Sequence, residues 1–329
     1  MTILVTGGCG LVGSFAVREA VARGVPVAAF DLALRTELLA DIRDKVTLVQ
    51  GNVLHAPDLY RAVRELDVTR ILHTASFLTP GAYARPYANA ELTIMGTLNV
   101  LECARAMGLK RVTYVSTGKT GWTGAAFAKT LDSGRFEVPA DPYASAKVGA
   151  ELLANDYRQL YDLDVRILRL GGQVYGPGFA FAGAIGQGLQ PFIEKPLRGE
   201  AVRYDQPVLA HSAPIIPMLY AADAGRGCMA ATLAADLPHV VYDINGPVAV
   251  TLHQLVQTIK TLIPGADIEV PEAPTEAGPF KAGPIAPDPR ARADFGYQPE
   301  YDLERGLREY IEFLKTGRYA AVAAAAARS

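Results

Sequence analysis

TGGCGLVG, residues 6–13, is the stretch that decides the fold of this 329-residue chain. The aliphatic residues Ile3 to Val5 precede it and predict a short buried strand. After it, apolar residues recur with helical spacing from Leu11 to Val21, and Gly24 is the expected stop of that helix. A strand, a glycine turn and a helix in this order can receive a dinucleotide pyrophosphate at the helix N-terminus.

The spaced glycines and a later acid together favour a dinucleotide site over an ordinary turn. Gly7 permits the tight turn, Gly10 lets the backbone approach a pyrophosphate, and Gly13 lets the helix pack closely on the strand. Residues 25–30 read as a second strand that ends at Asp31, an acid placed to bind the adenosine ribose hydroxyls. The same carboxylate would repel the 2′-phosphate of NADP, so the expected cofactor is NAD.

Strands and helices alternate through the first half of the chain. Expected strands cover residues 46–50, 70–76, 111–117 and 165–170, and expected helices cover 59–66, 86–107 and 142–161. This alternation predicts an α/β fold with a Rossmann-type, doubly wound parallel sheet, whose ligands bind at the carboxyl ends of the strands.

The pattern changes after Gly171, where Gly and Pro become frequent. Beyond that stretch we expect a helix over 219–233, a strand over 240–245, a helix opened by Thr251 as N-cap, and a helix over 301–314. The expected division is an NAD-binding domain at 1–170 with a contribution from 207–247, a smaller, mostly C-terminal substrate-binding lobe at 171–206 and 248–316, and a tail at 317–329.

Composition limits the class of protein. The chain has 32 basic and 34 acidic residues and no basic block, so neither nucleic acid nor a membrane surface is an expected partner. Three cysteines and five histidines are too scattered to indicate a disulfide framework or a metal site. Met1 runs directly into a strand, and no apolar run reaches the roughly 18 residues of a membrane span. We expect a cytoplasmic enzyme with a small-molecule substrate.

A second motif carries the chemistry. Tyr143 and Lys147 lie one helical turn apart, so both side chains project from the same face. A tyrosine acts as a base near neutrality only if its pKa of about 10 is lowered, and a neighbouring cation favours the phenolate. Ser116 and Thr117 end the strand 111–117, where their hydroxyls either hydrogen-bond a reacting oxygen or simply cap the strand.

Taken in order, these motifs resemble the extended short-chain dehydrogenase/reductases, the NAD-dependent epimerase/dehydratase family, over almost the full length. The matching segments are 6–13, Asp31, 51–53, 73–76, 96–99, 115–117, 142–147, 174–178, Asp223 and 295–299.

The resemblance implies roles for individual residues. Thr117, Tyr143 and Lys147 would form the catalytic set, with Ser116 as the fallback for Thr117. Tyr143 would take the proton of a substrate hydroxyl while hydride passes to the nicotinamide, and Lys147 would also hold the nicotinamide ribose. The implied cofactor-binding residues are Gly7, Gly10, Leu11, Val12, Gly13, Asp31, Asn52, Val53, Thr74, Ala75, Ser76, Ser116, Tyr143, Lys147 and Gly171. The implied substrate-binding residues are Phe77, Thr117, Gly118, Lys119 and Gln173.

The chain also departs from the family pattern. Dehydratases of the family carry an acidic pair directly after the catalytic hydroxyl, where this chain has Gly118 and Lys119. Nucleotide-sugar members usually have an arginine seven residues before the aspartate that matches Asp223, and here that residue is Ile216. The other replaced positions are Gln173 and Thr93 for two asparagines, and Gly121 or Trp122 for an aromatic residue of the catalytic loop.

We therefore expect an NAD-dependent dehydrogenase that acts on a secondary alcohol of a sugar-like or polyhydroxylated substrate. One alternative is a nucleotide-sugar 4-epimerase that keeps its NAD bound. Another is a non-catalytic dinucleotide-sensing protein, against which the retention of Tyr143 and Lys147 argues. Helices 86–107 and 142–161 carry apolar residues on more than one face, so we also expect a homodimer through a four-helix contact.

Overall fold

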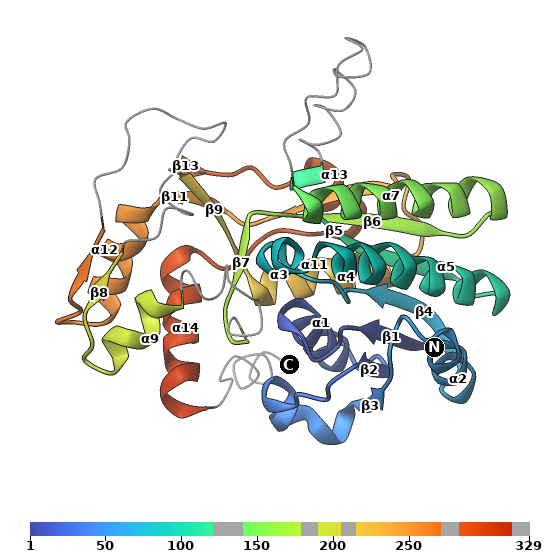
Figure 1. Cartoon of the computed structure of the whole chain (residues 1–329), viewed down its shortest axis with the longest axis horizontal. Coiled ribbons are helices and arrows are strands. Elements are labelled where there is room, and N and C mark those ends of the chain that lie inside the picture. Colours follow the sequence, from blue (N-terminus) through green and yellow to red (C-terminus); the bar gives the residue numbers. More distant parts are fainter. Residues whose placement is uncertain (121–140, 179–189, 205–214, 271–282, 318–329) are drawn as a thin grey trace, which may run out of the picture.

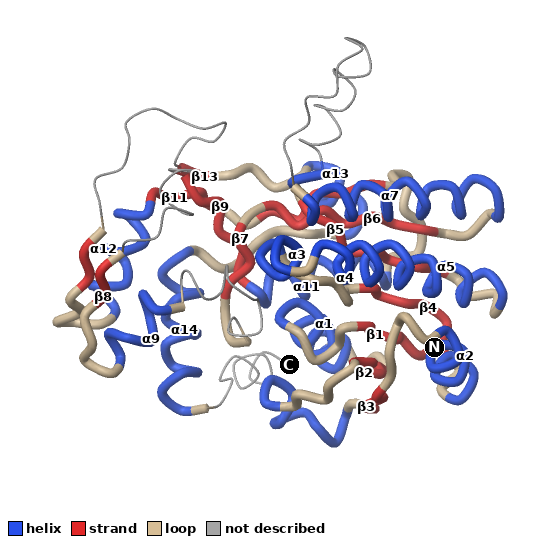
Figure 2. The backbone as a smooth tube through the Cα atoms, viewed as in Figure 1, coloured by secondary structure: helices blue, strands red, loops and turns tan. Residues whose placement is uncertain are grey.

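The computed structural model describes residues 1–120, 141–178, 190–204, 215–270 and 283–317. Its main element is a parallel sheet of seven strands in the order β10-β6-β5-β4-β1-β2-β3 (Figures 1 and 2). The strands are β1 (Thr2–Thr6), β2 (Val27–Asp31), β3 (Thr47–Gln50), β4 (Val68–His73), β5 (Arg111–Thr117), β6 (Val165–Gly171) and β10 (Val241–Asn245). The prediction of a doubly wound parallel sheet is confirmed.

Helices cover both faces of this sheet, which is why its strands read as continuous apolar runs. One face packs against α1 (Leu11–Ala22) and α11 (Ala221–Leu233), and the other against α2 (Ala56–Glu65), α5 (Gly96–Ala106) and α7 (Pro142–Tyr161). Alternate residues of β1 serve the two faces: Ile3 and Val5 belong to the first apolar cluster and Leu4 to the second.

The predicted helix 86–107 contains a wider turn. It consists of α4 (Pro86–Ala90), a π-helical turn η2 (Glu91–Met95) and α5, without a break between them. At its start the side-chain amide of Asn89, fully buried, donates to the carbonyl of Pro142 at 3.0 Å. This bond fixes the beginning of α7 against the first helix.

A smaller lobe lies at the end of the molecule opposite α5 and α7 (Figure 1). Its four-stranded sheet has the order β13-β11-β9-β7, and a two-stranded sheet pairs β12 with β8. These strands are β7 (Gln173–Tyr175), β8 (Val202–Arg203), β9 (Ile215–Tyr220), β11 (Val248–Thr251), β12 (Ile268–Glu269) and β13 (Gly283–Pro284). The helices packed with them are α9 (Pro191–Leu197), α12 (Leu252–Leu262) and α14 (Leu303–Thr316).

One expectation for this region needs correction. The helix expected from Leu219 begins at Ala221, because Leu219 and Tyr220 end β9. Pro217 lies within that strand and pairs with Ala249, and a proline ordinarily argues against a strand. The remaining short elements are η1 (Glu37–Lys45), α3 (Thr79–Ala84) and α13 (Pro289–Phe295).

Candidate active site

The glycine turn forms a backbone cradle at the carboxyl end of β1. Gly7 has a φ of +69°, and a Cβ added at Gly13 would overlap the carbonyl oxygen of Gly7. At Gly10 the Gly7 oxygen, 3.2 Å from an added Cβ, is the one neighbour within 4 Å, so the turn is open on that side. No side chain caps α1, which leaves its first amides available to a ligand. This geometry fits a pyrophosphate.

Asp31 lies beside this turn at the end of β2. Its Oδ2 accepts a hydrogen bond from the backbone N–H of Cys9 at 3.0 Å, and its Oδ1 accepts one from Ala33 at 3.3 Å. The bond to Cys9 holds the carboxylate against the glycine turn, and Asp31 as a whole remains partly exposed. A carboxylate in this position can still accept hydrogen bonds from two ribose hydroxyls.

The neighbouring strand ends extend the same line. Asn52 and Val53 follow β3, and the Asn52 Oδ1 accepts from the N–H of Leu54 at 2.9 Å. Thr74 follows β4 and donates to the carbonyl of Thr6 at 2.7 Å, joining the ends of β4 and β1 at the point where strand order reverses. The other predicted cofactor and substrate residues along this edge are Ala75, Ser76 and Phe77 after β4 and Gly171 at the end of β6.

Helix α7 carries the predicted base. Asp141 caps it, accepting from the N–H of Ala144 at 3.0 Å, and Pro142 occupies its first turn. Tyr143 is 8% exposed and shares a hydrogen bond with the hydroxyl of Thr117. Lys147, also buried, donates from Nζ to the carbonyl of Val115 at 2.8 Å. The structure thus places Thr117 beside Tyr143, with Lys147 buried one helical turn further along α7.

Burial controls the protonation of this pair. Desolvation raises the pKa of Tyr143 to about 12, against the lowering effect of the Thr117 hydrogen bond. Desolvation lowers the pKa of Lys147 to about 7, and the negative charge of Glu151 opposes that shift. With these pKa values Lys147 loses its proton near neutrality, well before Tyr143 does.

His73 is a buried histidine close to Lys147. His73 is buried at the end of β4, between the hydroxyls of Thr6, 2.6 Å from Nδ1, and Thr97, 3.2 Å from Nε2. Burial and the charge of Lys147 lower the pKa of His73 to about 3, so the imidazole is neutral across the physiological range. It therefore serves as a hydrogen-bonding spacer and not as a proton carrier.

Ser116 and Thr117 point in different directions, as neighbours in a strand do. The Ser116 hydroxyl is buried and donates to the Glu151 carboxylate at 2.5 Å, whereas Thr117 bonds Tyr143. The Thr117 hydroxyl is therefore the one beside the base. Glu151, which also binds Arg169, is a member of this site that the sequence motifs did not single out as functional.

The predicted substrate residues are only partly gathered. Lys119 follows Thr117 closely, and its Nζ lies 3.1 Å from Asp141 Oδ2 and 6.0 Å from the Tyr143 ring centroid. Gly118 donates to the carbonyl of Leu170 at 2.8 Å, at the end of β6. Gln173 instead belongs to β7, and its amide bonds its neighbour's carbonyl at 3.2 Å. Gly121 and Trp122 lie outside the described residues.

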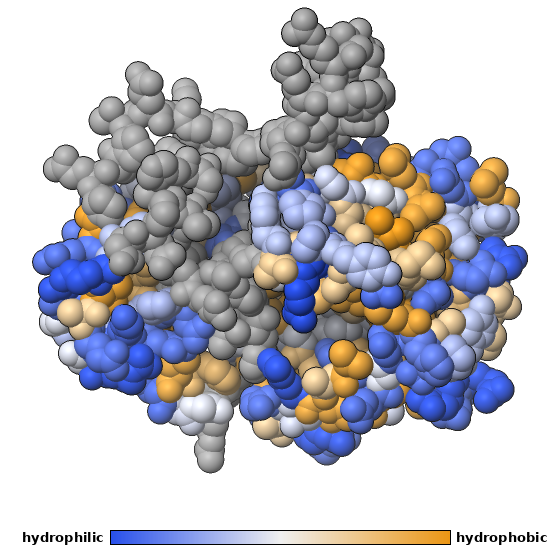
Figure 3. Space-filling model, viewed as in Figure 1, coloured by the Kyte–Doolittle hydropathy of each residue, from blue (hydrophilic) through white to orange (hydrophobic). Residues whose placement is uncertain are grey.

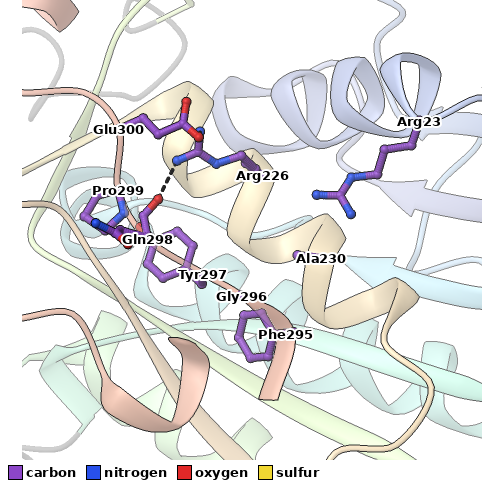
Figure 4. Close-up of a pocket in the computed structure, with 9 residues that line it drawn as sticks. All are labelled: Arg23, Arg226, Ala230, Phe295, Gly296, Tyr297, Gln298, Pro299 and Glu300. Atoms are coloured by element: carbon purple, nitrogen blue, oxygen red, sulfur yellow. Dashed lines mark hydrogen bonds and ion pairs between the residues drawn. The ribbon is translucent and has the colours of Figure 1, made fainter. Parts of the chain in front are cut away.

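A separate cavity of about 390 Å³ lies at the far end of α1 (Figure 4). Arg226 spans it, pairing with Asp223 and Glu300 at 2.6 Å each and donating to the carbonyl of Gln298. The lining is Arg23, Arg226, Ala230, Phe295, Gly296, Tyr297, Gln298, Pro299 and Glu300. None of these was predicted to bind cofactor or substrate. The cavity belongs to the contacts that attach the segment after α13 to α11.

Comparison with known proteins identifies the family of this chain. Residues 3–244 match the model of the NAD dependent epimerase/dehydratase family. The chain belongs to this family. The resemblance noted from the sequence is thereby confirmed, and so is the expectation of an NAD-dependent enzyme of the short-chain dehydrogenase/reductase type. Within the described residues no helix is long and apolar enough to cross a membrane.

Individual relatives extend over nearly the whole chain. A UDP-glucose 4-epimerase of Mycolicibacterium smegmatis is 27% identical over 96% of this chain and 99% of its own. The UDP-glucose 4-epimerase of Thermus thermophilus, solved in complex with NAD, has a TM-score of 0.75 at 22% identity, covering 96% and 99% of the two chains. The GalE-like L-threonine dehydrogenase of Cupriavidus necator has a TM-score of 0.71 at 24% identity, covering 94% and 99%. These two structures share the fold.

The position of Asp31 gives a test of cofactor choice. We expect NADH to bind at least about tenfold more tightly than NADPH, because a 2′-phosphate would meet the carboxylate. Asp31→Asn should reduce this preference, as measured by fluorescence titration of both dinucleotides. Asp44→Asn, an exposed carboxylate of η1, is the control and should leave it unchanged. Tighter binding of NADPH to the wild type would contradict the role of Asp31.

Proposed function

We propose that the protein is an NAD-dependent dehydrogenase acting on a secondary alcohol of a sugar-like or polyhydroxylated substrate. The observation that carries the proposal is that the Thr117 hydroxyl, at the carboxyl end of β5, adjoins the Tyr143 phenol, while Lys147 is buried one turn further along α7 and donates to the carbonyl of Val115. The glycine cradle and Asp31 support NAD binding in the same row of strand ends.

The three side chains divide the reaction between them. Bound NAD supplies the hydride acceptor and a positive ring. Thr117 hydrogen-bonds the substrate hydroxyl beside Tyr143 and keeps its oxygen in place as the carbonyl forms. The Tyr143 phenolate accepts the hydroxyl proton, and the Lys147 ammonium stabilises the phenolate beforehand. The substrate loses one hydride and one proton and becomes a ketone.

Three replaced residues favour a substrate without a diphosphate and a reaction without elimination. Ile216 is 7% exposed and packs in the apolar cluster of the smaller lobe, where nucleotide-sugar members usually carry an arginine. Gly118 and Lys119 stand after Thr117, so the acids that a dehydration needs are replaced by a glycine and a cation.

A nucleotide-sugar 4-epimerase is the second candidate. The names of the relatives favour it, since the M. smegmatis enzyme and the T. thermophilus structure are both UDP-glucose 4-epimerases. The same hydride would then return to the substrate after the ketone turns over. The C. necator structure, which has the same fold, is named as an L-threonine dehydrogenase, so the fold also occurs in a dehydrogenase. A non-catalytic sensing protein would have no use for the Tyr143–Lys147 pair.

One assay separates these functions. Purified protein is incubated with NAD and a panel of polyols, aldonates, uronates and nucleotide sugars, and both NADH absorbance and substrate identity are followed. A dehydrogenase accumulates NADH with its ketone product. An epimerase converts a nucleotide sugar with no net NADH, and a sensing protein changes neither. Thermal shifts on the same panel identify ligands independently of turnover.

The outer faces of two helices support the proposal of a homodimer. Tyr87 of α4, Met95 of η2 and Leu152 and Leu160 of α7 are 81%, 48%, 60% and 72% exposed. Figure 3 shows hydrophobic side chains gathered over this part of the molecule. Such a patch is the kind of surface that two copies cover by a two-fold contact. We expect a dimeric mass by light scattering at micromolar concentration.

A matched pair of variants tests this interface. Leu160→Arg should give a monomeric mass, because it buries an unpaired charge in the contact. Leu32→Arg changes a side chain of similar exposure, 65%, that directly follows β2 and belongs to neither helix, and it should leave the dimer intact. A wild-type protein that is monomeric at these concentrations contradicts the dimer.

A further inference from the structure

Glu151 is a buried carboxylate that the proposed reaction does not use. It lies on α7 one turn after Lys147 and two turns after Tyr143, and it is 7% exposed. Its oxygens accept hydrogen bonds from Ser116 Oγ at 2.5 Å and Thr120 Oγ1 at 2.9 Å. Burying a carboxylate costs several kcal/mol unless its bonds are satisfied, so this arrangement is specific.

Arg169 completes the site. Its Nε and Nη2 lie 3.1 and 2.6 Å from the Glu151 oxygens, a two-pronged, charge-assisted contact. Arg169 is paired with Ser116 across β5 and β6, so Glu151 binds side chains of two neighbouring strands at one register position. Thr120 also donates to the carbonyl of Thr117 at 2.7 Å. The contacts of Glu151 therefore surround the residue that holds the substrate oxygen.

The charge of Glu151 acts on Lys147 as well. The groups that face the Lys147 amine are Glu151 on α7, the Tyr114 ring at 4.9 Å, the Val115 carbonyl, and neutral His73. Among these Glu151 is the carboxylate. Arg169 pairs with Glu151, and Asp243 and Arg290 act in turn on Arg169.

We propose that Glu151 is a positioning residue of the hydride-transfer reaction, which holds the Thr117-bearing end of β5 against α7 and keeps Lys147 in its ammonium form. The inference rests on the proposed function for its kinetic part. The negative charge of Glu151 makes the proton of Lys147 harder to lose, so that Lys147 keeps the positive charge that stabilises the Tyr143 phenolate.

Glu151→Gln tests the charge at nearly constant size. The titration of Lys147, followed by NMR in lysine-labelled protein and assigned with Lys147→Ala, should move to lower pH by about one pH unit. In kinetics, the acid limb of the pH–rate profile should move in the same direction and the plateau should fall about tenfold. Glu102→Gln, on an exposed carboxylate of α5, is the control and should change neither.

A second variant tests the positioning at constant charge. Ser116→Ala/Thr120→Val keeps the Glu151 carboxylate but removes the two hydroxyls that bind it, one at the end of β5 and one just after that strand. We expect turnover to fall about three- to tenfold with the acid limb in place. This arm also keeps the proposal testable if Glu151→Gln does not fold, because unchanged turnover in the double variant would overturn it.

The outcomes are distinguishable. If Lys147 titrates at the wild-type pH in Glu151→Gln, the charge role is overturned. If Glu151→Gln loses activity equally at every pH, the residue acts only through stability and the proposal is also overturned. If the wild type transfers hydride from no substrate, the proposed function fails, while the NMR titration still decides whether Glu151 holds the charge of Lys147.

Discussion

Tyr143→Phe should lower turnover by about 10²- to 10⁴-fold while leaving NAD binding and the fold nearly intact. The substitution removes one hydroxyl, and general base catalysis typically contributes a factor of this size. The ring remains buried beside Thr117, so the loss in stability should be limited to one hydrogen bond, about 1 kcal/mol. Steady-state kinetics with any substrate found, NAD titration and thermal unfolding measure the three quantities.

Tyr157→Phe is the matched control for that variant. Tyr157 lies on the same helix α7, and its hydroxyl donates to Glu102 Oε2 at 3.0 Å on the outer surface. The change is chemically identical but lies away from the strand ends, so turnover should stay within about twofold of the wild type. Near-normal turnover in Tyr143→Phe would exclude Tyr143 as the base and return the search to other protonatable groups of the site.

Local signals were sufficient for the elements that carry the base and its partners. The predicted strand 111–117 and helix 142–161 coincide with β5 and α7. The strand is a buried run, and the helix has an Asp-Pro start that satisfies its first amides. The glycine turn was equally readable, because Gly7 and Gly13 occupy positions that a side chain would obstruct.

The smaller lobe was less readable for a physical reason. Its strands β7 and β13 have three and two residues, too few to show the alternation that marks a strand. Pro217 lies inside β9, where it concealed the strand and moved the expected start of α11 back to Leu219. This sheet is stabilised by pairing between short segments that are distant in the chain. Such pairing leaves no local pattern in the sequence.

The same limit applies to Glu151. Helical spacing already placed it on the side of α7 that carries Tyr143 and Lys147. The spacing does not identify the partners of Glu151, because they are distant in the chain: Ser116 lies 35 residues before it and Arg169 lies 18 residues after it. Only the β5–β6 ladder brings these two partners to one carboxylate. A buried charge network of this kind follows from topology and not from a motif.

Lys147→Met should abolish most of the activity and move its pH dependence. The wild type should gain activity in alcohol oxidation as pH rises through an apparent pKa well below that of a free tyrosine, because the Lys147 ammonium stabilises the Tyr143 phenolate. In the variant no ammonium stabilises the Tyr143 phenolate, so the acid limb should move to higher pH. Turnover near neutrality should fall by at least about 10³-fold, and NAD affinity should weaken as well.

Stability separates this loss from unfolding. The folded state lowers the pKa of Lys147 from 10.5 to about 7, so the unfolded chain binds the proton more tightly and stability decreases as pH falls through this window. Methionine removes this cost, on the order of 3–5 kcal/mol below pH 7, and loses one hydrogen bond to Val115. Lys147→Met should therefore be at least as stable as the wild type at pH 6. An inactive variant whose thermal midpoint falls at that pH would show that Lys147 acts through the fold, whereas an active one with an unmoved acid limb would remove Lys147 from the reaction.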